Sequence, residues 1–553
     1  MTQKARVWVT QRRERQTGLL DDPVGIPWRT LAIIGVAAAA VTFILLVAGS
    51  LSSYDNYALS SDFGIYHQAW YQIAHGQLNP VDTISPKGRS AYGIPYLDNH
   101  FELIFWPLSL LYFIYPHSID LLIVQDAATA ATLVVAFLFV CDMLRKEWTR
   151  SGRSGTIVAV VVLAVLVADP FTYWAASGNF HLQAVATLFL VLAARDLFAG
   201  HRGHKRRSYL WMVALLACGD VAATYLIGLG LSALVSGRET AKVGGMAILT
   251  SLAWLALVSA LHANHGSDLV SFYGYLASHP IHSGGIAAIM TILLGIVTHP
   301  STPIRQIGSR LGDLSRMILG AGTIGLASII GAGVSLVVLV VNALSAGNFL
   351  QPRLAFQDFP ALVFIAIGIA SVTAWLGKVG RVGFLLSLAL LAVPLAGVAV
   401  TGTTWFPKLS SSLASQYSAN TSILVQAART IPSNAEVVAT SSVIGRFSGH
   451  RYVYPLAGIR TLGESNRLAT VTTEPISTRT VFFIVVTDTK GQFLVAPSRV
   501  MRYAASYLSN HYHTTTVAKG GDVVVLRAYF PPRVHSIDIP VPLGVLFGKS
   551  KVG

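Results

Sequence analysis

Charged residues are scarce in this chain: 12% of the 553 residues are Asp, Glu, Lys or Arg, whereas 53% are hydrophobic. Soluble globular domains carry about 25% charged residues, so a soluble fold would leave too much apolar surface in contact with water. Apolar stretches long enough to cross a hydrocarbon core of about 30 Å recur along the sequence. The composition therefore predicts a multi-pass α-helical membrane protein.

Cysteine is also rare, since only Cys141 and Cys218 occur, and both lie in or beside apolar runs. Two such residues argue against a disulfide framework and against a thiolate metal site. The net charge of +15 does not indicate nucleic-acid binding, because much of it falls in short loops, where Lys and Arg mark the cytoplasmic side of a membrane protein. The sequence identifies no metal-binding residues and no cofactor, and a divalent cation stays open as a requirement.

Apolar length and flanking charge predict eleven spans after a cytoplasmic N-terminal arm, residues 1–30. The spans are residues 31–51, 119–141, 156–172, 181–199, 208–218, 221–236, 243–261, 284–298, 317–342, 359–376 and 383–402. The basic clusters fall on one side of these spans, which we predict to be cytoplasmic. They are the N-terminal arm, Arg145 to Arg153, Arg202 to Arg207, Arg238 with Lys242, Arg305 with Arg310 and Arg316, and Lys378 with Arg381.

The sequence divides into two large parts. Residues 31–402 are predicted to form a transmembrane catalytic domain with a long first outer loop, residues 52–118, in which the aromatic-rich stretch 101–115 lies along the membrane surface. After residue 402, β-branched runs such as "TVFFIVVTD" alternate with helical patterns such as "SRVMRYAASYLSNHY". Residues 403–553 therefore predict a small extracytoplasmic α/β domain.

Polar residues from four predicted outer loops lie at the level where the membrane ends. They are Asp62, His67, Asp98, His100, Glu102, Asn179, His181, Asp220 and Arg353. Polar groups at this depth are costly and usually face a cavity, so their convergence predicts a site for binding and catalysis.

Simpler roles remain open for several of these residues. Asp62 precedes a helical pattern and would also serve as its N-cap. His100 and Glu102 are two residues apart, which would place them on different faces of a helix. The guanidinium of Arg353 suits a phosphate group, but an arginine at an interface also extends toward water to keep its charge solvated.

Two stretches, "SDFGIYHQAWYQIAHGQ" and "YLDNHFELIFWPLSLLYFIYP", together with "ASGNFHLQAVATLFLVLAARDLFAGHR", resemble the membrane-protein family catalogued as domain of unknown function 2079. That family in turn resembles the C-type glycosyltransferase superfamily, integral-membrane enzymes that take sugars from polyprenyl-phosphate donors. The resemblance implies that Asp62 is the acidic residue of the first outer loop that acts as catalytic base or positions the acceptor. It also implies a polyprenyl-phosphate-linked sugar donor, a glycan or lipid acceptor and membrane lipids as partners.

Three functions are consistent with the sequence. The first is an inverting glycosyltransferase in which Asp62 takes a proton from the acceptor and Arg353 stabilises the departing phosphate. The second is a transporter or flippase of lipid-linked glycans, which would favour inverted repeats and interrupted helices. The third is a non-catalytic envelope assembly protein that acts through its C-terminal domain.

Overall fold

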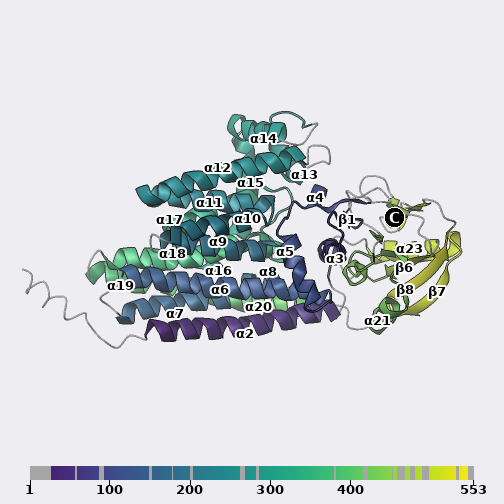
Figure 1. The fold of residues 1–553 in the computed structure, drawn as a ribbon, viewed down its shortest axis with the longest axis horizontal. Helices are drawn as coiled ribbons and strands as arrows, with labels where there is room; N and C mark the ends of the chain where they lie inside the picture. Colours follow the sequence, from purple (N-terminus) through teal and green to yellow (C-terminus); the bar gives the residue numbers. More distant parts are fainter. Residues whose placement is uncertain are drawn as a thin grey trace, which may run out of the picture.

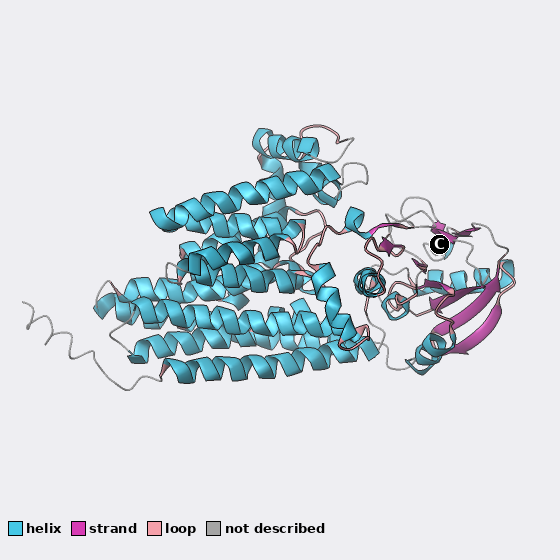
Figure 2. Ribbon diagram, in the orientation of Figure 1, coloured by secondary structure: helices cyan, strands magenta, loops and turns pink. Residues whose placement is uncertain are grey.

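The computed structural model describes residues 27–545, and most of these residues are helical (Figure 1, Figure 2). Within that range it does not describe residues 56–58, 86–92, 148–151, 177–178, 200–203, 262–267, 282–285, 379–380, 415–420, 451, 457–466, 474–479, 489–496, 531–534 and 543. Most of the predicted N-terminal arm and the last residues of the chain therefore lie outside the described part.

Among the described residues, five helical stretches are long and apolar enough to cross a membrane, or seven if each of two bent pairs forms one span. The five are α2 (Trp28–Asp55), α6 (Ile119–Glu147), α12 (Arg238–Leu261), α18 (Phe359–Gly377), and α19 (Arg381–Leu390) with α20 (Ala392–Ala414). The bent pairs are α7 (Gly152–Ala168) with α8 (Pro170–Ala176), and α14 (Ile286–Thr298) with α15 (Ser301–Ser309). The other helices of the bundle are α9 (Gln183–Phe198), α10 (His204–Leu216), α11 (Asp220–Ser236), α16 (Leu311–Ala321) and α17 (Ile329–Leu344).

Small residues let neighbouring helices of the bundle approach closely. A Cβ atom at Gly244 of α12 would lie 2.5 Å from the carbonyl oxygen of Gly230 in α11, and one at Gly333 of α17 would lie 2.7 Å from the carbonyl oxygen of Gly228. Such contacts are typical of membrane helices, which associate through backbone packing because lipid offers no hydrophobic driving force. They explain how α11 packs against both α12 and α17.

The bundle has two different ends (Figure 1). One end, here called the domain end, carries the first long loop and the C-terminal domain. The loop contains α3 (Ser61–Ala74), β1 (Val81–Asp82), β2 (Ile94–Pro95), α4 (Tyr96–Asn99), α5 (Phe105–Ser109) and η1 (Leu110–Phe113). The opposite end, here called the basic end, carries the connections α6–α7, α9–α10, α11–α12 and α18–α19. Their flanking residues include Arg145, Arg207, Arg238 and Lys378.

The stretch 101–115 does not cross the bundle. It forms the two short helices α5 and η1 at the domain end, and Leu110, Phe113 and Ile114 expose most of their apolar surface. Exposed apolar side chains beside the end of a membrane bundle are typical of a segment lying at the interface, in agreement with the sequence-based expectation.

The prediction that Arg305, Arg310 and Arg316 share a face with the other basic clusters is wrong. Gln306 Nε2 donates to the carbonyl oxygen of Ser345 over 3.5 Å, and Asn348 Nδ2 donates to Asp313 Oδ2 over 3.2 Å. The guanidinium of Arg316 lies over the ring of Trp405, 5.3 Å from its centroid. Because Ser345 follows the end of α17 and Trp405 lies in the last part of α20, this basic segment belongs to the domain end.

Two predicted spans, 284–298 and 317–342, are not continuous crossings. The axis of α14 turns by 89° into α15. After α16 the chain forms η3 (Thr323–Ala327), where Gly325 packs against the backbone of Ile365 inside the bundle, and α17 then returns to the domain end. Apolar length alone cannot distinguish such a return from a crossing. Among the described residues, α2 begins at the basic end and the C-terminal domain lies at the domain end, so the two are at opposite ends of the bundle (Figure 1).

The C-terminal domain contains a five-stranded mixed sheet in the order β4-β3-β6-β8-β7. Strands β4, β3 and β6 are parallel, and β8 is antiparallel to both β6 and β7. The strands are β3 (Glu436–Ala439), β4 (Val453–Pro455), β6 (Thr480–Val486), β7 (Thr515–Gly520) and β8 (Val523–Tyr529), and a separate pair consists of β5 (Arg467–Thr473) and β9 (His535–Pro540). The helices are α21 (Thr421–Thr430), η5 (Ile444–Phe447) and α23 (Ser498–His511). A small α/β domain at this position agrees with the sequence-based prediction.

Alternation along the strands explains why helices cover both faces of this sheet. Phe483 of β6 packs with Met501 of α23, whereas its neighbours Phe482 and Ile484 join the cluster that contains Leu424 of α21. Successive side chains of a strand point to opposite faces, so the continuous apolar run of β6 predicts a strand buried on both sides.

The position of the 305–316 segment can be tested by cysteine labelling. Ser309 and Ser411 are exposed at the domain end and Ser236 is exposed at the basic end, while the native cysteines are buried. We expect a membrane-impermeant maleimide to label Ser309→Cys and Ser411→Cys in intact cells, and Ser236→Cys only after permeabilisation. Labelling of Ser309→Cys together with Ser236→Cys would restore the original eleven-span scheme.

Candidate functional site

Helix α3 begins with a cap that leaves the Asp62 carboxyl free. Ser60 is the N-cap, and its hydroxyl accepts a hydrogen bond from the backbone N–H of Asp62 over 3.3 Å. The hypothesis that Asp62 itself caps the helix is therefore wrong. Its partly buried carboxylate receives no hydrogen bond from the part of the chain that the structure describes, and burial raises its pKa from 3.8 to about 6.

The start of α3 is held in place from the bundle. Gln125 of α6 is fully buried and donates hydrogen bonds of 3.0 Å to the carbonyl oxygens of Ala176 and Asn179, while its own oxygen accepts from the backbone N–H of His181 over 2.5 Å. Asn179 Oδ1 in turn accepts from the backbone N–H of Ser60 over 2.8 Å. Asn179, predicted to bind substrate, thus uses its amide oxygen to position α3.

Two tyrosines hold a buried carboxyl next to this helix. Tyr66, one turn after Asp62, donates to Glu102 Oε1 over 3.1 Å, and Tyr96 donates to Glu102 Oε2 over 2.6 Å. Burial raises the pKa of Glu102 to about 8, although the two phenol hydrogen bonds oppose that shift. At pH 7 Glu102 is therefore mostly protonated. Sequence reasoning missed Tyr66, which the four-residue spacing from Asp62 places on the same face of α3.

His100 and Glu102 lie together rather than on different faces. After α4 the chain makes a tight turn, in which Glu102 donates its backbone N–H to the carbonyl oxygen of His100 over 3.0 Å. His100 Nδ1 lies 4.0 Å from Glu102 Oε1, and its ring centroid lies 5.1 Å from that of Tyr66. The helical periodicity assumed from the sequence does not apply here.

A glycine turn brings Asp220 to the same place. Gly219 has a φ of 119°, and a Cβ atom there would lie 3.2 Å from Glu102 Cγ, while Ile104 donates its N–H to the carbonyl oxygen of Ala217 over 2.8 Å. Asp220 is exposed; burial raises the pKa of Tyr66, and the carboxylates of Glu102, Asp62 and Asp220 add to that shift. Three acidic groups from three segments therefore act electrostatically on one phenol.

His181 forms another side of this group. Its ring stacks on Phe356 with 3.4 Å between centroids and lies 6.2 Å from the ring of Tyr66. Burial lowers the pKa of His181 to about 3, so this imidazole is neutral at physiological pH. Phe356 belongs to η4 (Pro352–Gln357), which brings the loop after α17 to the site.

Three further predicted site residues are His67, Asp98 and Arg353. His67 makes a 2.7 Å hydrogen bond with Ser448 of the C-terminal domain, and burial lowers its pKa to about 3. Its role in binding substrate stays a prediction. Asp98 is partly exposed in α4. The side chain of Arg353 lies outside the described residues, although its backbone is part of η4.

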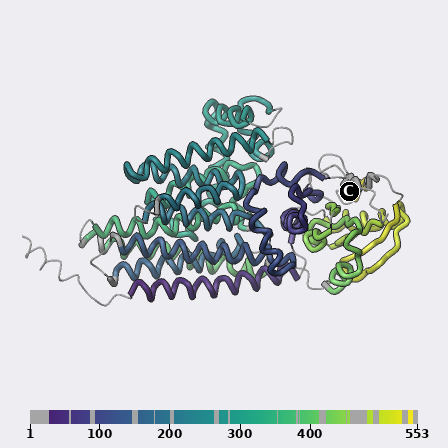
Figure 3. Tube along the Cα trace, in the orientation of Figure 1, coloured from purple at the N-terminus to yellow at the C-terminus, as the bar shows by residue number. Residues whose placement is uncertain are grey.

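The C-terminal domain covers the other face of α3 (Figure 3). A Cβ atom at Gly445 would lie 2.5 Å from Phe63 Cδ1, and the guanidinium of Arg446 lies 3.7 Å from the ring centroid of Tyr54. Thr83 Oγ1 also donates to the carbonyl oxygen of Val453 over 2.6 Å. Helix α3 is thus fixed between the bundle and the sheet. Within the described residues, no three His, Cys, Asp or Glu side chains are arranged to hold a metal ion.

Residues 57–473, more than half of the chain and including most of the site residues, match the model of the family described as "Predicted membrane protein (DUF2079)". The chain belongs to this family. Nothing among the curated proteins matches the sequence. The crystal structure of ArnT from Cupriavidus metallidurans in the apo state aligns over 89% of this chain and 98% of that one, with 14% sequence identity and a TM-score of 0.41. Values this low do not establish a common fold.

Substitutions at Glu102 test its hydrogen bonds. We expect Glu102→Ala to lower the free energy of unfolding by about 2–4 kcal/mol, because it leaves two buried phenol hydroxyls without an acceptor. Glu102→Gln keeps an acceptor oxygen and, since the wild-type carboxyl is mostly protonated at pH 7, removes little charge, so we expect a loss below about 1 kcal/mol. Thermal unfolding of purified protein in detergent measures both.

The pH dependence of stability supplies the control. Between pH 4.5 and about 8 the folded state keeps a proton on Glu102 that the unfolded chain releases. The free energy of unfolding of the wild type should therefore fall as pH rises through this range. Glu102→Gln should lack this pH dependence. If Glu102→Gln and Glu102→Ala lowered the free energy of unfolding equally at pH 7, Glu102 would instead be ionised.

Proposed function

We propose that this chain is an integral-membrane glycosyltransferase that moves a sugar from a polyprenyl-phosphate donor to an extracytoplasmic acceptor, with Asp62 as the catalytic base. The observation that carries the proposal is the partly buried carboxyl of Asp62 at the domain end, which accepts no hydrogen bond from the described residues and whose pKa burial raises to about 6. A general base works best when its pKa is near the working pH, because it is then ionised and still holds a proton well.

The proposed reaction is a single displacement. The acceptor hydroxyl oxygen attacks the anomeric carbon, the bond from that carbon to the phosphate oxygen breaks, and polyprenyl phosphate leaves with the electron pair. Asp62 takes the hydroxyl proton, and the sugar inverts at the anomeric carbon. Arg353 is proposed, from the sequence alone, to stabilise the phosphate. His100, His181 and Asp220 would line the site around the sugar.

Glu102 is a poorer candidate for the base than Asp62. Both of its oxygens already accept hydrogen bonds from Tyr66 and Tyr96, and with a pKa of about 8 it holds a proton at neutral pH. We propose that it positions Tyr66 and the loop before α5. An extracytoplasmic site also suits the donor, since a polyprenyl-phosphate sugar carries its own leaving group and needs no nucleotide. The resemblance of the sequence to C-type glycosyltransferases supports the same assignment.

A transporter of lipid-linked glycans is the second candidate. Interrupted helices inside the bundle are a feature of transporters, and here α7 and α8 meet at 44° while α16 and α17 are separated by η3. Proteoliposomes separate the two functions. Transfer of radiolabelled sugar to an acceptor supports the enzyme, whereas movement of the labelled lipid between leaflets without transfer supports the transporter.

Asp62→Asn tests the proposed base. Asparagine keeps the size of the side chain but cannot take a proton, so we expect transfer to fall by roughly 10²-fold or more. Folding should be unaffected, because Ser60 and not Asp62 caps α3. Asp55→Asn, at an exposed position near the end of α2, is the matched control and should leave transfer unchanged.

The pH profile of the wild type gives a second measure of Asp62. Transfer should decline as pH falls below about 6, because the base is then protonated. Near-normal transfer by Asp62→Asn, or a profile that is flat between pH 5 and 7, would assign the proton transfer to another group.

The phosphate role of Arg353 is tested by donor binding. Arg353→Lys keeps the charge but loses the planar fork that binds two phosphate oxygens at once. We expect weaker donor binding with normal folding, measured by titration of the purified protein with a polyprenyl-phosphate sugar. Unchanged binding by Arg353→Ala would remove this residue from the site.

A further inference from the structure

A second polar group lies beyond the residues assigned above, where α17 and α18 meet. Asp358 precedes α18 but makes no side-chain capping bond to it. The carboxyl is fully buried, and Oδ1 accepts a 2.8 Å hydrogen bond from Asn342 Nδ2, which also donates to the carbonyl oxygen of Gln357 over 3.2 Å. Oδ2 has no partner among the described residues. Capping therefore does not explain why a carboxyl is buried here.

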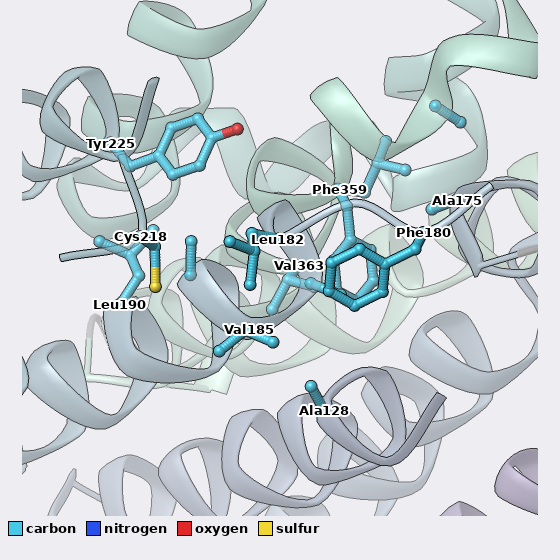
Figure 4. Close-up of a cluster of buried hydrophobic side chains, with 14 of the residues drawn as sticks. Ala128, Ala175, Phe180, Leu182, Val185, Leu190, Cys218, Tyr225, Phe359 and Val363 are labelled. Carbon is cyan, nitrogen blue, oxygen red and sulfur yellow. The ribbon is translucent and has the colours of Figure 1, made fainter. Parts of the chain in front are cut away.

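Tyr225 of α11 faces the same region. Its side chain is 1% exposed, yet its hydroxyl has no hydrogen-bond partner in the described part of the chain. Figure 4 shows this hydroxyl pointing away from Cys218 and Leu190. Asp358 and Asp220 both act electrostatically on the phenol. Asp220 also acts electrostatically on Tyr66, so both tyrosines lie within the influence of this carboxylate.

Two buried polar groups that find no partner among the described residues are expensive. A buried donor or acceptor without a partner costs about 1–3 kcal/mol, and the protein would avoid that cost with apolar side chains of similar size. The neighbouring side chains of Phe359 and Leu182 are apolar and supply no hydrogen bond (Figure 4). Such groups instead suit a polar ligand that supplies the missing hydrogen bonds.

The charges around these groups restrict the ligand. Burial raises the pKa of Asp358 to about 8, so the lining of Asp358, Asn342 and Tyr225 is mostly uncharged at pH 7. An anionic sugar would meet the carboxylates of Asp62 and Asp220. A cationic amino sugar would bring a charge into an apolar region at a desolvation cost that one ion pair seldom repays. Hydroxyl groups both donate and accept, which matches the unpartnered oxygens.

We infer that Asp358 and Tyr225 bind hydroxyl groups of the transferred sugar, and hence that the donor carries an uncharged sugar. This inference rests on the proposed function and specifies its substrate class. Asp358 and Tyr225 hold the sugar on one side while Asp62 faces the acceptor on the other, with Asp220 between them.

Donor binding and stability, measured together, test the inference. Tyr225→Phe removes a hydroxyl that has no partner within the described protein, so its Tm should stay the same or rise, while affinity for the sugar-bearing donor should fall about tenfold. Asp358→Asn remains uncharged and hydrogen-bonding, so it should keep donor affinity within about threefold. Tyr275→Phe is the matched control, because the hydroxyl of this exposed tyrosine already donates to Leu344; its donor affinity should not change.

The probes are polyprenyl phosphate alone and the same lipid bearing glucose, galactose, mannose, arabinose, glucosamine or glucuronate, titrated against full-length protein in nanodiscs. We expect at least one uncharged sugar to bind more tightly than the sugar-free lipid, and neither glucosamine nor glucuronate to do so. This gain should be lost in Tyr225→Phe.

Tighter binding of the glucosamine or glucuronate lipid would overturn the inference and leave the glycosyltransferase proposal intact. The same holds if Tyr225→Phe keeps the tighter binding of the sugar-bearing lipid, a result that would mean that the two oxygens bind water only. Failure of the wild type to bind any of these lipids, the sugar-free one included, would overturn the inference and the proposed function together.

Discussion

The arrangement of the candidate site depends on one buried amide, that of Gln125. Its three hydrogen bonds fix the chain between α8 and α9, and that chain supplies both His181 and Asn179. Asn179 then holds the backbone of Ser60, and Ser60 caps α3. A backbone that turns at the edge of a membrane cannot rely on water for all its hydrogen bonds. The same bonds that satisfy this turn therefore determine where the carboxyl of Asp62 lies.

The electrostatics of the site follow from this placement. Asp62, Glu102 and Asp220 come from separate segments but share Tyr66 as a neighbour. Their surroundings differ: Glu102 is buried between two phenols, Asp62 is partly exposed without a donor from the described residues, and Asp220 is exposed. Acidic groups in such unlike surroundings hold their protons to different degrees at one pH, which is how neighbouring carboxyls take different roles.

Much of the architecture could be predicted from the sequence. Apolar excess indicated the membrane bundle, and β-branched runs and helical patterns located elements such as β6 and α23. Most of the sequence-based predictions that were wrong concern which segments lie close together. Charge counting could not show that Arg316 returns to Trp405, because apolar length does not distinguish a crossing from a return. Local pattern suggested Asp62 as a cap, but the chain placed Ser60 there. Nothing in the sequence pairs His67 with Ser448, which lies almost 400 residues later.

The sheet of the C-terminal domain includes strands that lie beyond the part of the chain that matches the family model. The family match ends at residue 473, yet β3 lies between β4 and β6, and β6 begins only at Thr480. A chain ending at the family boundary would leave one edge of β3 without its hydrogen-bonded neighbour. The turn that follows β3 holds Gly445 against Phe63 of α3. Residues beyond the family match thus complete the sheet whose neighbouring turn packs against the first loop, so a cut at residue 473 would disturb both parts of the molecule.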